Sequence, residues 1–343
     1  MPLIDTENLL QPIAGDEPTG TNLEYDPAFA ALERIAQGKP EQQMGETIVP
    51  GEPPDWKAVH DQAATLLGRS KDLRIVSHLV RALLHRSGFI GLSEGLSVMC
   101  GLLERYWAPL HPRLDPDDQH DPTIRISALA LLSDPSLLIA LRSAPLIASR
   151  TFGAISLRDI AVASGEIAAA AEAPKMETTT IEAAFQDVTD EALEATATAI
   201  TRAFEHLRRI EAVFTGSAGV AGPDVTGLTQ ILNQANRAVG PRLERRKAAA
   251  AAMAAGAAGE TTVHANGTGA RMAVSGEITS REDVVRALDK ICDYYARHEP
   301  SSPLPLLLQR CKRLATMSFI EIVREMVPDG LSQIEIIAGK REG

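Results

Sequence analysis

The chain has 343 residues, a length typical of two to three domains, and a formal net charge of −11. Hydrophobic residues make up 45% of it, enough to build cores, but aromatic residues only 4%, and the dominance of alanine and leucine favours helices over sheets. Because an acidic chain repels phosphate backbones, we expect no nucleic-acid partner.

The sequence carries no sign of export or of membrane insertion. Its first ten residues, MPLIDTENLL, lack the basic region and apolar core of a signal peptide, and no stretch reaches the ~18 uncharged apolar residues of a membrane span. Cys100, Cys292 and Cys311 lie far apart without CxxC spacing, which is typical of buried thiols in a reducing compartment. We therefore expect a cytoplasmic protein that does not insert into a membrane.

Turn-forming residues dominate the first 55 positions. One short helix fits between Pro27 and Gln37, because Phe29, Leu32 and Ile35 fall on one face at helical spacing. The glycine- and proline-rich stretch 38–54 predicts an exposed loop.

From Asp55 the pattern becomes helical. Asp55 is a good N-cap for a helix that reaches residue 67. Apolar residues three and four apart predict a second helix over 72–87, with Gly88 as its C-terminal cap, and a third over 91–107.

The next part alternates between loops and helices. A proline-rich acidic loop covers 109–121, and the stretch 143–156 could be extended. Helices are predicted over 123–132, 135–141, 157–172, from near 180, over 190–214, and over 225–239. Gly240-Pro241 should end the last of these, although this helix could continue over 241–255. The basic cluster Arg242–Lys247 is interpreted as a solvated helix face.

Residues 248–276 are mostly alanine, glycine and threonine, which predicts a flexible linker whose leading alanines could extend the helix before it. The last part, 277–343, predicts three short helices, a thin core that often needs oligomerisation. In particular, Leu306, Leu307 and Leu308 cannot all face one core, because three consecutive helical positions span about 200°.

The sequence contains no recognisable active-site motif. GxxxxGK[ST], GxSxG and HExxH are all missing, so we expect no enzyme, cofactor or metal site. His78 and His85 share a helix face without a third metal ligand. A weaker alternative is a hydrolase with a cation site between His111 and Asp121, where four aspartates gather.

Two regions resemble the TssA (ImpA-related) family of bacterial type VI secretion. The second region spans 299–330 and is similar to the C-terminal domain of the family's short class. The first resembles the ImpA N-terminal domain and carries these motifs in order: Pro12-Ile13, Gly20-Thr21-Asn22-Leu23-Glu24-Tyr25-Asp26-Pro27, Asp55-Trp56, Ser70-Lys71-Asp72-Leu73-Arg74, Gly88-Phe89, Tyr106-Trp107, Leu110-His111-Pro112 and Asp121-Pro122.

This resemblance implies an all-α, multi-domain protein without enzymatic activity. Together with the composition of the chain, it gives four parts: an ImpA-like domain (1–150), a middle helical domain inferred only by its position (151–247), the linker (248–276) and a ring-forming domain (277–343). Members are ring-forming assembly factors that contact baseplate, sheath and tube components, and some work at the membrane complex. The competing interpretation is a generic helical scaffold or adaptor that binds partner helices outside secretion.

Two sets of site residues follow. The family motif of the first region contributes Asn22, Leu23, Tyr25, Asp26, Pro27, Trp56 and Trp107. The expected interface of the homo-oligomer contains Pro303, Leu304, Leu306, Leu307, Leu308, Cys311 and Leu314.

Overall fold

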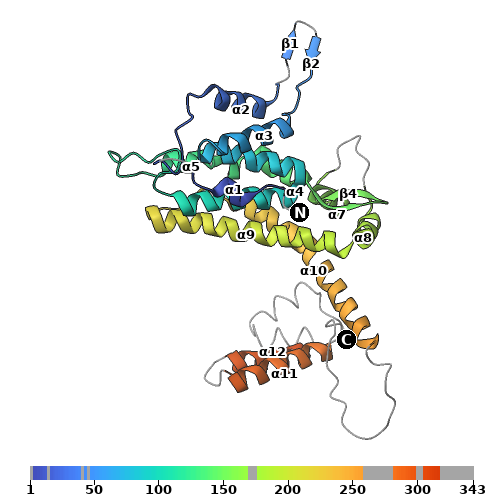
Figure 1. Ribbon diagram of the computed structural model, residues 1–343. Coiled ribbons are helices and arrows are strands. Elements are labelled where there is room, and N and C mark those ends of the chain that lie inside the picture. The colour runs from blue at the N-terminus through green and yellow to red at the C-terminus, as the bar shows by residue number, and fades with distance from the viewer. Residues whose placement is uncertain are drawn as a thin grey trace, which may run out of the picture. The chain divides into compact units, whose positions relative to one another are not determined.

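A computed structural model describes residues 3–13, 16–39, 42–44, 47–168, 176–257, 281–298 and 304–316 (Figure 1). The chain divides into two compact units, Met1–Thr262 and Val263–Gly343. Each unit is treated by itself below. The four-part division expected from the sequence stays a prediction.

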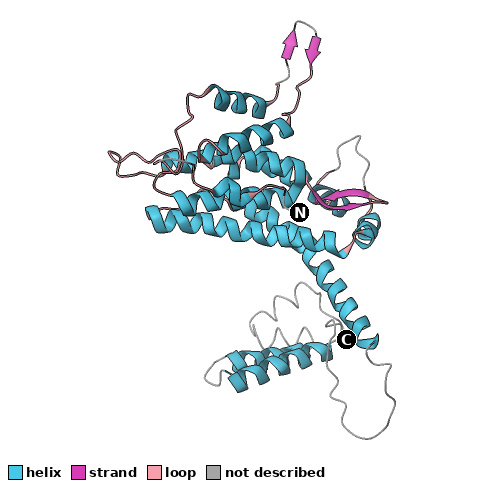
Figure 2. Ribbon diagram, viewed as in Figure 1, coloured by secondary structure: helices cyan, strands magenta, loops and turns pink. Residues whose placement is uncertain are grey.

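The described residues are mostly helical, as expected, with two short antiparallel hairpins added (Figure 2). The first unit contains α1 (Thr6–Leu10), α2 (Pro27–Gln37), β1 (Gln42–Met44), β2 (Thr47–Val49), α3 (Trp56–Leu67), α4 (Leu73–Tyr106), α5 (Thr123–Ala128), the 3₁₀ turn η1 (Ala130–Ser133), α6 (Pro135–Ser143), β3 (Pro145–Ser149), β4 (Gly153–Ser156), α7 (Leu157–Ser164), α8 (Thr178–Asp187), α9 (Asp190–Ala218) and α10 (Thr226–Ala257). The second contains α11 (Arg281–His298) and α12 (Leu304–Thr316).

The hairpins show where the sequence was misread. The predicted loop 38–54 contains β1 and β2, which pair in register from Gln42 with Val49 to Met44 with Thr47. Thr47-Ile48-Val49 is β-branched throughout and favours a strand, but three residues are too few to outweigh flanking turn formers in a sequence pattern. The uncertain stretch 143–156 forms the second hairpin, β3–β4.

Local capping signals were reliable. Asp26 and Asp55 cap α2 and α3 through side-chain oxygens that accept backbone N–H groups, and Phe29 and Leu32 of α2 are buried as predicted. The predicted break at Gly88 is confirmed, since Ser87 and Gly88 leave helical geometry and Gly88 has a φ of +57°. We therefore treat α4 as two helical segments.

The two segments of α4 run antiparallel and approach closely. A Cβ at Gly91 would lie 2.0 Å from the Leu83 carbonyl oxygen, and one at Gly95 would lie 2.9 Å from the Cα of Val80. Such contacts allow only hydrogen on these Cα atoms. The paired segments form the centre of the core, against which α3 packs on one side and α9 on another (Figure 1).

The helix predicted over 225–239 does not end at Gly240-Pro241. Its alternative continuation over 241–255 is the one observed, because α10 runs through Pro241 to Ala257. Val239 and Leu243, on either side of the proline, are both buried in the same core. Tertiary packing thus outweighs the lost backbone hydrogen bond. The first alanines of the predicted linker extend this helix, and the rest of that linker lies outside the described residues.

The basic cluster on α10 is only in part a solvated face. Arg242 pairs with Glu182 and lies over the Phe185 ring at 4.2 Å, and Arg246 donates to Asp190 Oδ1 at 2.6 Å. Lys247 pairs with Glu194 at 2.8 Å. These cations join α10 to α8 and α9. The prediction of a solvated face is wrong for the half-buried Arg242 and Arg246, whereas Arg245 and Lys247 are exposed.

In the second unit, α11 and α12 pack against each other. Lys312 Nζ lies 2.5 Å from Asp289 Oδ1, which links the two helices across this contact. Two of the three helices predicted over 277–343 are thus observed, and residues 317–343, where the third would lie, fall outside the described residues. No helix in the described ranges is long and apolar enough to cross a membrane.

Candidate functional site

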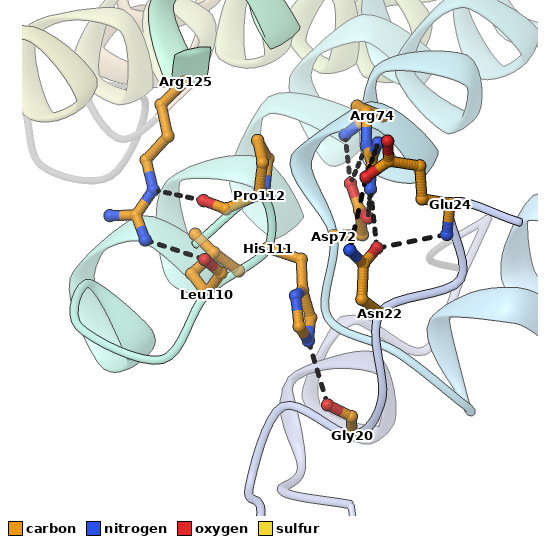
Figure 3. A network of polar contacts seen from close by, with 9 residues as sticks. All are labelled: Gly20, Asn22, Glu24, Asp72, Arg74, Leu110, His111, Pro112 and Arg125. Atoms are coloured by element: carbon orange, nitrogen blue, oxygen red, sulfur yellow. Dashed lines mark hydrogen bonds and ion pairs between the residues drawn. The ribbon is translucent and has the colours of Figure 1, made fainter. Parts of the chain in front are cut away.

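Several motifs of the first region meet in a polar cluster that joins three segments distant in sequence (Figure 3). These segments are 19–26, 69–74 and 107–112. Backbone bridges join Gly20 to Ser70 and Asp72 to His111, and the buried Thr19 hydroxyl donates to the Pro109 carbonyl at 2.9 Å. We call this the motif cluster.

Asp72 and Arg74 form its central ion pair. Asp72 is fully buried, caps α4 by accepting the Arg74 N–H, and accepts from the Arg74 guanidinium at 2.7 and 3.1 Å. Burial alone would lower the pKa of Arg74, but the hydrogen bonds and charge of Asp72 outweigh it and the pKa is raised. The guanidinium also donates to Asn22 Oδ1 at 3.0 Å, and Asn22 in turn accepts the Glu24 N–H.

His111 holds the opposite side of the cluster. Its ring is buried, and Nε2 lies 2.9 Å from the Gly20 carbonyl oxygen. Since a carbonyl only accepts, Nε2 carries the proton. The other ring nitrogen, Nδ1, is buried and makes no hydrogen bond with a described residue. His111 therefore positions the turn at Gly20 and does not point into the acidic loop.

Arg125 fixes the loop that carries His111. Its side chain is fully buried, and it donates to the carbonyls of Trp107, Leu110 and Pro112 at 2.6, 2.7 and 3.0 Å. The guanidinium also lies 4.8 Å from the centre of the Trp107 ring. No carboxylate pairs with it among the described residues, so burial lowers its pKa to about 10, and it stays charged at neutral pH.

Lys71 is a second buried cation. It donates to the Leu9 and Leu67 carbonyls at 2.8 and 2.9 Å, and burial lowers its pKa. It thereby attaches the end of α1 to the end of α3. Like Arg125, it uses a charge to satisfy backbone carbonyls at the ends of elements.

The outer surface of the cluster presents one aromatic side chain. Tyr25 is 93% exposed, whereas Leu23, two residues earlier, is buried. Asp26 accepts from the Ala28 N–H and from the Arg69 guanidinium, which lowers its pKa, and Pro27 begins α2. Tyr25 thus lies between two residues, Asn22 and Asp26, whose hydrogen bonds fix the backbone on either side of it.

The two tryptophans of the motif lie apart and do different work. Trp56 stacks on His85 with ring centres 3.9 Å apart, with Arg81 over its ring. Trp107 meets Phe214 of α9 edge-on at 5.2 Å. Both are half-buried, so the structure brings Asn22, Leu23, Tyr25, Asp26 and Pro27 together but not these two rings.

The expected interface residues fall on α12, with exposures that differ sharply. Leu306 and Leu307 are 73% and 59% exposed, and Leu304 is 41% exposed. Leu308 and Leu314 are half-buried and Cys311 is exposed. Pro303 lies outside the described residues. The Leu306–Leu308 triplet is thus divided between the inner and outer sides of the helix, as its geometry required.

The acidic loop holds its carboxylates in local turns. Asp115 accepts the Asp117 N–H and Asp121 accepts the Thr123 N–H, both through Oδ1. No group of three histidine, cysteine or carboxylate side chains in the described part of the chain could hold a metal ion. The geometry therefore gives the hydrolase alternative no support.

Sequence reasoning missed Arg125 and the central role of Asp72, Arg74 and His111. The last three stand within quoted motifs, but nothing in their spacing showed that residues 22, 74 and 111 meet. For Arg125 there was one signal, a cation between Ile124 and Ile126 on a short helix. Its function follows only once the loop 107–112 folds over it.

Known proteins match both the sequence and this fold. A family model described as "ImpA, N-terminal, type VI secretion system" matches residues 10–134, the part that carries the motif cluster. The type VI secretion system component TssA1 of Pseudomonas aeruginosa is 44% identical, over 98% of this chain and 99% of that protein. A solved N-terminal domain, including the conserved ImpA_N region, of the TssA component of the type VI secretion system from Burkholderia cenocepacia is also similar. It has a TM-score of 0.57 and 25% identity, and the match covers 70% of this chain and 94% of that one.

Proposed function

The chain belongs to the TssA family of type VI secretion system components, and from this membership we propose that it is a structural assembly factor of that system. It assembles into a homo-oligomeric ring through residues 277–343. In the cytoplasm this ring contacts baseplate, sheath and tube components. Its role is binding and positioning, without enzymatic activity.

The observation that carries the ring proposal is the exposed leucine surface of α12. Leu304, Leu306 and Leu307 expose 41%, 73% and 59% of their surface on a two-helix hairpin. Three exposed leucines on one short helix are costly in water, and burial against a neighbouring copy would remove that cost. Closed rings repeat one such contact around an axis.

The motif cluster supports the contact part of the proposal. Most of its polar groups form hydrogen bonds with backbone carbonyls or with one another. These bonds fix the turn that carries Tyr25, whose side chain is exposed. Tyrosine is enriched in protein interfaces because its ring is apolar and its hydroxyl can still form hydrogen bonds. We assign the surface around Tyr25 to a partner component.

Native mass spectrometry of the full chain tests the ring. The unchanged protein should give a single high-order oligomer of six or more copies. The double change Leu306→Asp and Leu307→Asp should dissociate it, because each copy would bring two carboxylates to the contact. Circular dichroism should show unchanged helix content.

Gln309→Asp is the control for an added carboxylate, since it places one negative charge, against two in the double variant, at an exposed polar position of the same helix. This variant should assemble normally. A monomeric or dimeric unchanged protein, or a full ring formed by the double variant, would contradict the proposal. The adaptor interpretation would then move ahead.

A further inference from the structure

A groove of about 580 Å³ lies between α6, α7 and α10 of the first unit, and it shares no lining residue with the motif cluster. Leu157, Ile160 and Ala238 contribute buried or half-buried apolar surface to its lining. Its volume lies within the range of sites that bind another molecule. The proposed function does not use this groove.

Two large apolar side chains are exposed in the same groove. Ile139 of α6 is 64% exposed and Ile167, just after α7, is 44% exposed. A single exposed isoleucine is ordinary, but two that line one groove extend its apolar surface to the rim. An occupant that covers this rim must itself be apolar on one side.

The charge of the groove is opposite to that of the whole chain. Its lining contains four arginines against one glutamate, Glu166, so its net charge is +3 in a protein of net charge −11. Arg142 donates to Gln234 at 2.8 Å and Arg242 pairs with Glu182. Arg158 and Arg237 are exposed and form no ion pair with any described residue.

These two properties define the chemistry of the occupant. We propose that the groove docks an acidic amphipathic helix of a partner protein, with its apolar stripe on the isoleucines and its carboxylates on Arg158 and Arg237. Arginine suits this role because its planar fork can bind a carboxylate through two hydrogen bonds. A free phosphate would satisfy the arginines but leave both isoleucines in water.

This inference deepens the proposed function and rests on it, because an assembly factor must hold other components of the machine. An amphipathic helix in a groove is a recurrent mode of protein recognition. The oppositely charged rim would also speed its encounter with the partner and exclude basic helices. The groove and the α12 surface therefore have separate tasks and separate tests.

The test measures binding of a designed probe to the full chain by fluorescence anisotropy. The probe is a fluorescein-labelled helical peptide of about 18 residues, five turns, with leucines on one face and glutamates beside them. It should bind saturably, and added salt should weaken it. Arg158→Glu with Arg237→Glu should weaken binding at least ~10-fold, and so should Ile139→Asp alone.

Arg208→Glu with Arg245→Glu is the matched control, because both arginines are exposed and form no ion pair with a described residue. This variant should bind like the unchanged protein. A second peptide with glutamine in place of glutamate should bind at least ~10-fold more weakly. Equal binding by the groove variant, or by the glutamine peptide, would overturn the inference, as would full displacement of the probe by inorganic phosphate.

Native mass spectrometry of the same groove variant separates this inference from the ring. An intact ring with lost peptide binding supports the groove. Loss of the ring in this variant would show that a second copy occupies the groove, which also overturns the inference. Peptide binding by an unchanged protein that forms no ring would instead contradict the proposed function alone.

Discussion

The motif cluster and α12 differ in whether their side chains find partners within the chain. In the cluster, buried cations find acceptors inside the chain, as Arg125 does with three backbone carbonyls. On α12, Leu306 and Leu307 face outward with most of their surface exposed. A region whose buried polar groups form hydrogen bonds within the chain contributes to stability. A region whose apolar side chains stay exposed is available for binding.

The largest effect on stability is expected from a change of Arg125. Arg125→Ala would leave three carbonyls of the loop 107–112 without their donor and open a cavity beside Trp107. We expect the free energy of unfolding of the first unit to fall by ~3–5 kcal/mol. Urea unfolding followed by tryptophan fluorescence checks this, because both tryptophans, Trp56 and Trp107, lie in that unit. A loss under ~1 kcal/mol would contradict the assigned role.

The second prediction is that mild acid lowers the free energy of unfolding of the first unit. Burial, with a smaller effect from Arg81, lowers the pKa of His78 from 6.5 to about 4. Between these values the unfolded chain binds more protons than the folded one, so the free energy of unfolding falls as the pH drops. From pH 7 to pH 5 this histidine accounts for a loss of ~2 kcal/mol.

His78→Gln should remove that part of the pH dependence. Burial also lowers the pKa of His85 and His206, and both lie in the first unit, so some acid sensitivity should remain. The measurement is the urea midpoint at pH 7 and pH 5 for both proteins. Identical pH dependence in the two would show that His78 is not the group that titrates.

A smaller effect is expected at the break in α4. Gly88 has a φ of +57°, a conformation that costs a residue with a Cβ atom roughly 1–2 kcal/mol. Gly88→Ala should lower the tryptophan-monitored stability by that amount. Gly216→Ala is the matched control, since it lies inside α9 with no atom near its added methyl group and should be neutral or slightly stabilising.

The smallest effect belongs to Tyr25, the exposed member of the cluster. Tyr25→Ala removes a side chain that is 93% exposed, so stability should change by less than ~0.5 kcal/mol. If the surface around Tyr25 binds a partner component as proposed, the same variant should lose affinity for that partner. A large loss of stability would place Tyr25 with the structural members of the cluster.

Local signals predicted much of the fold. The caps at Asp26 and Asp55 and the break at Gly88 were found because each depends on one residue and its immediate neighbours. Helix α1 was not predicted, since five residues among turn formers give no periodic pattern. The end predicted at Pro241 failed because long-range burial of Val239 and Leu243 determines that helix.

The candidate site was less accessible from sequence. Asn22 and Tyr25 were chosen by resemblance. Both are exposed, but the Asn22 amide accepts hydrogen bonds from Glu24 and Arg74, whereas the Tyr25 ring projects into solvent. The pairing of Asn22 with Arg74 joins residues 52 positions apart. No spacing rule covers such a contact, because the loops between the helices decide it.

Pro241 has a mechanical consequence. Proline has no N–H, so the carbonyl of Arg237, four residues earlier, lacks the donor that a regular helix would supply. Bending α10 at that turn therefore breaks one hydrogen bond fewer than bending it elsewhere, and Gly240 adds backbone freedom at the same place. We therefore expect α10 to bend most easily at the turn before Pro241. Arg237 lies in that turn and lines the groove, so a bend in α10 would move this arginine.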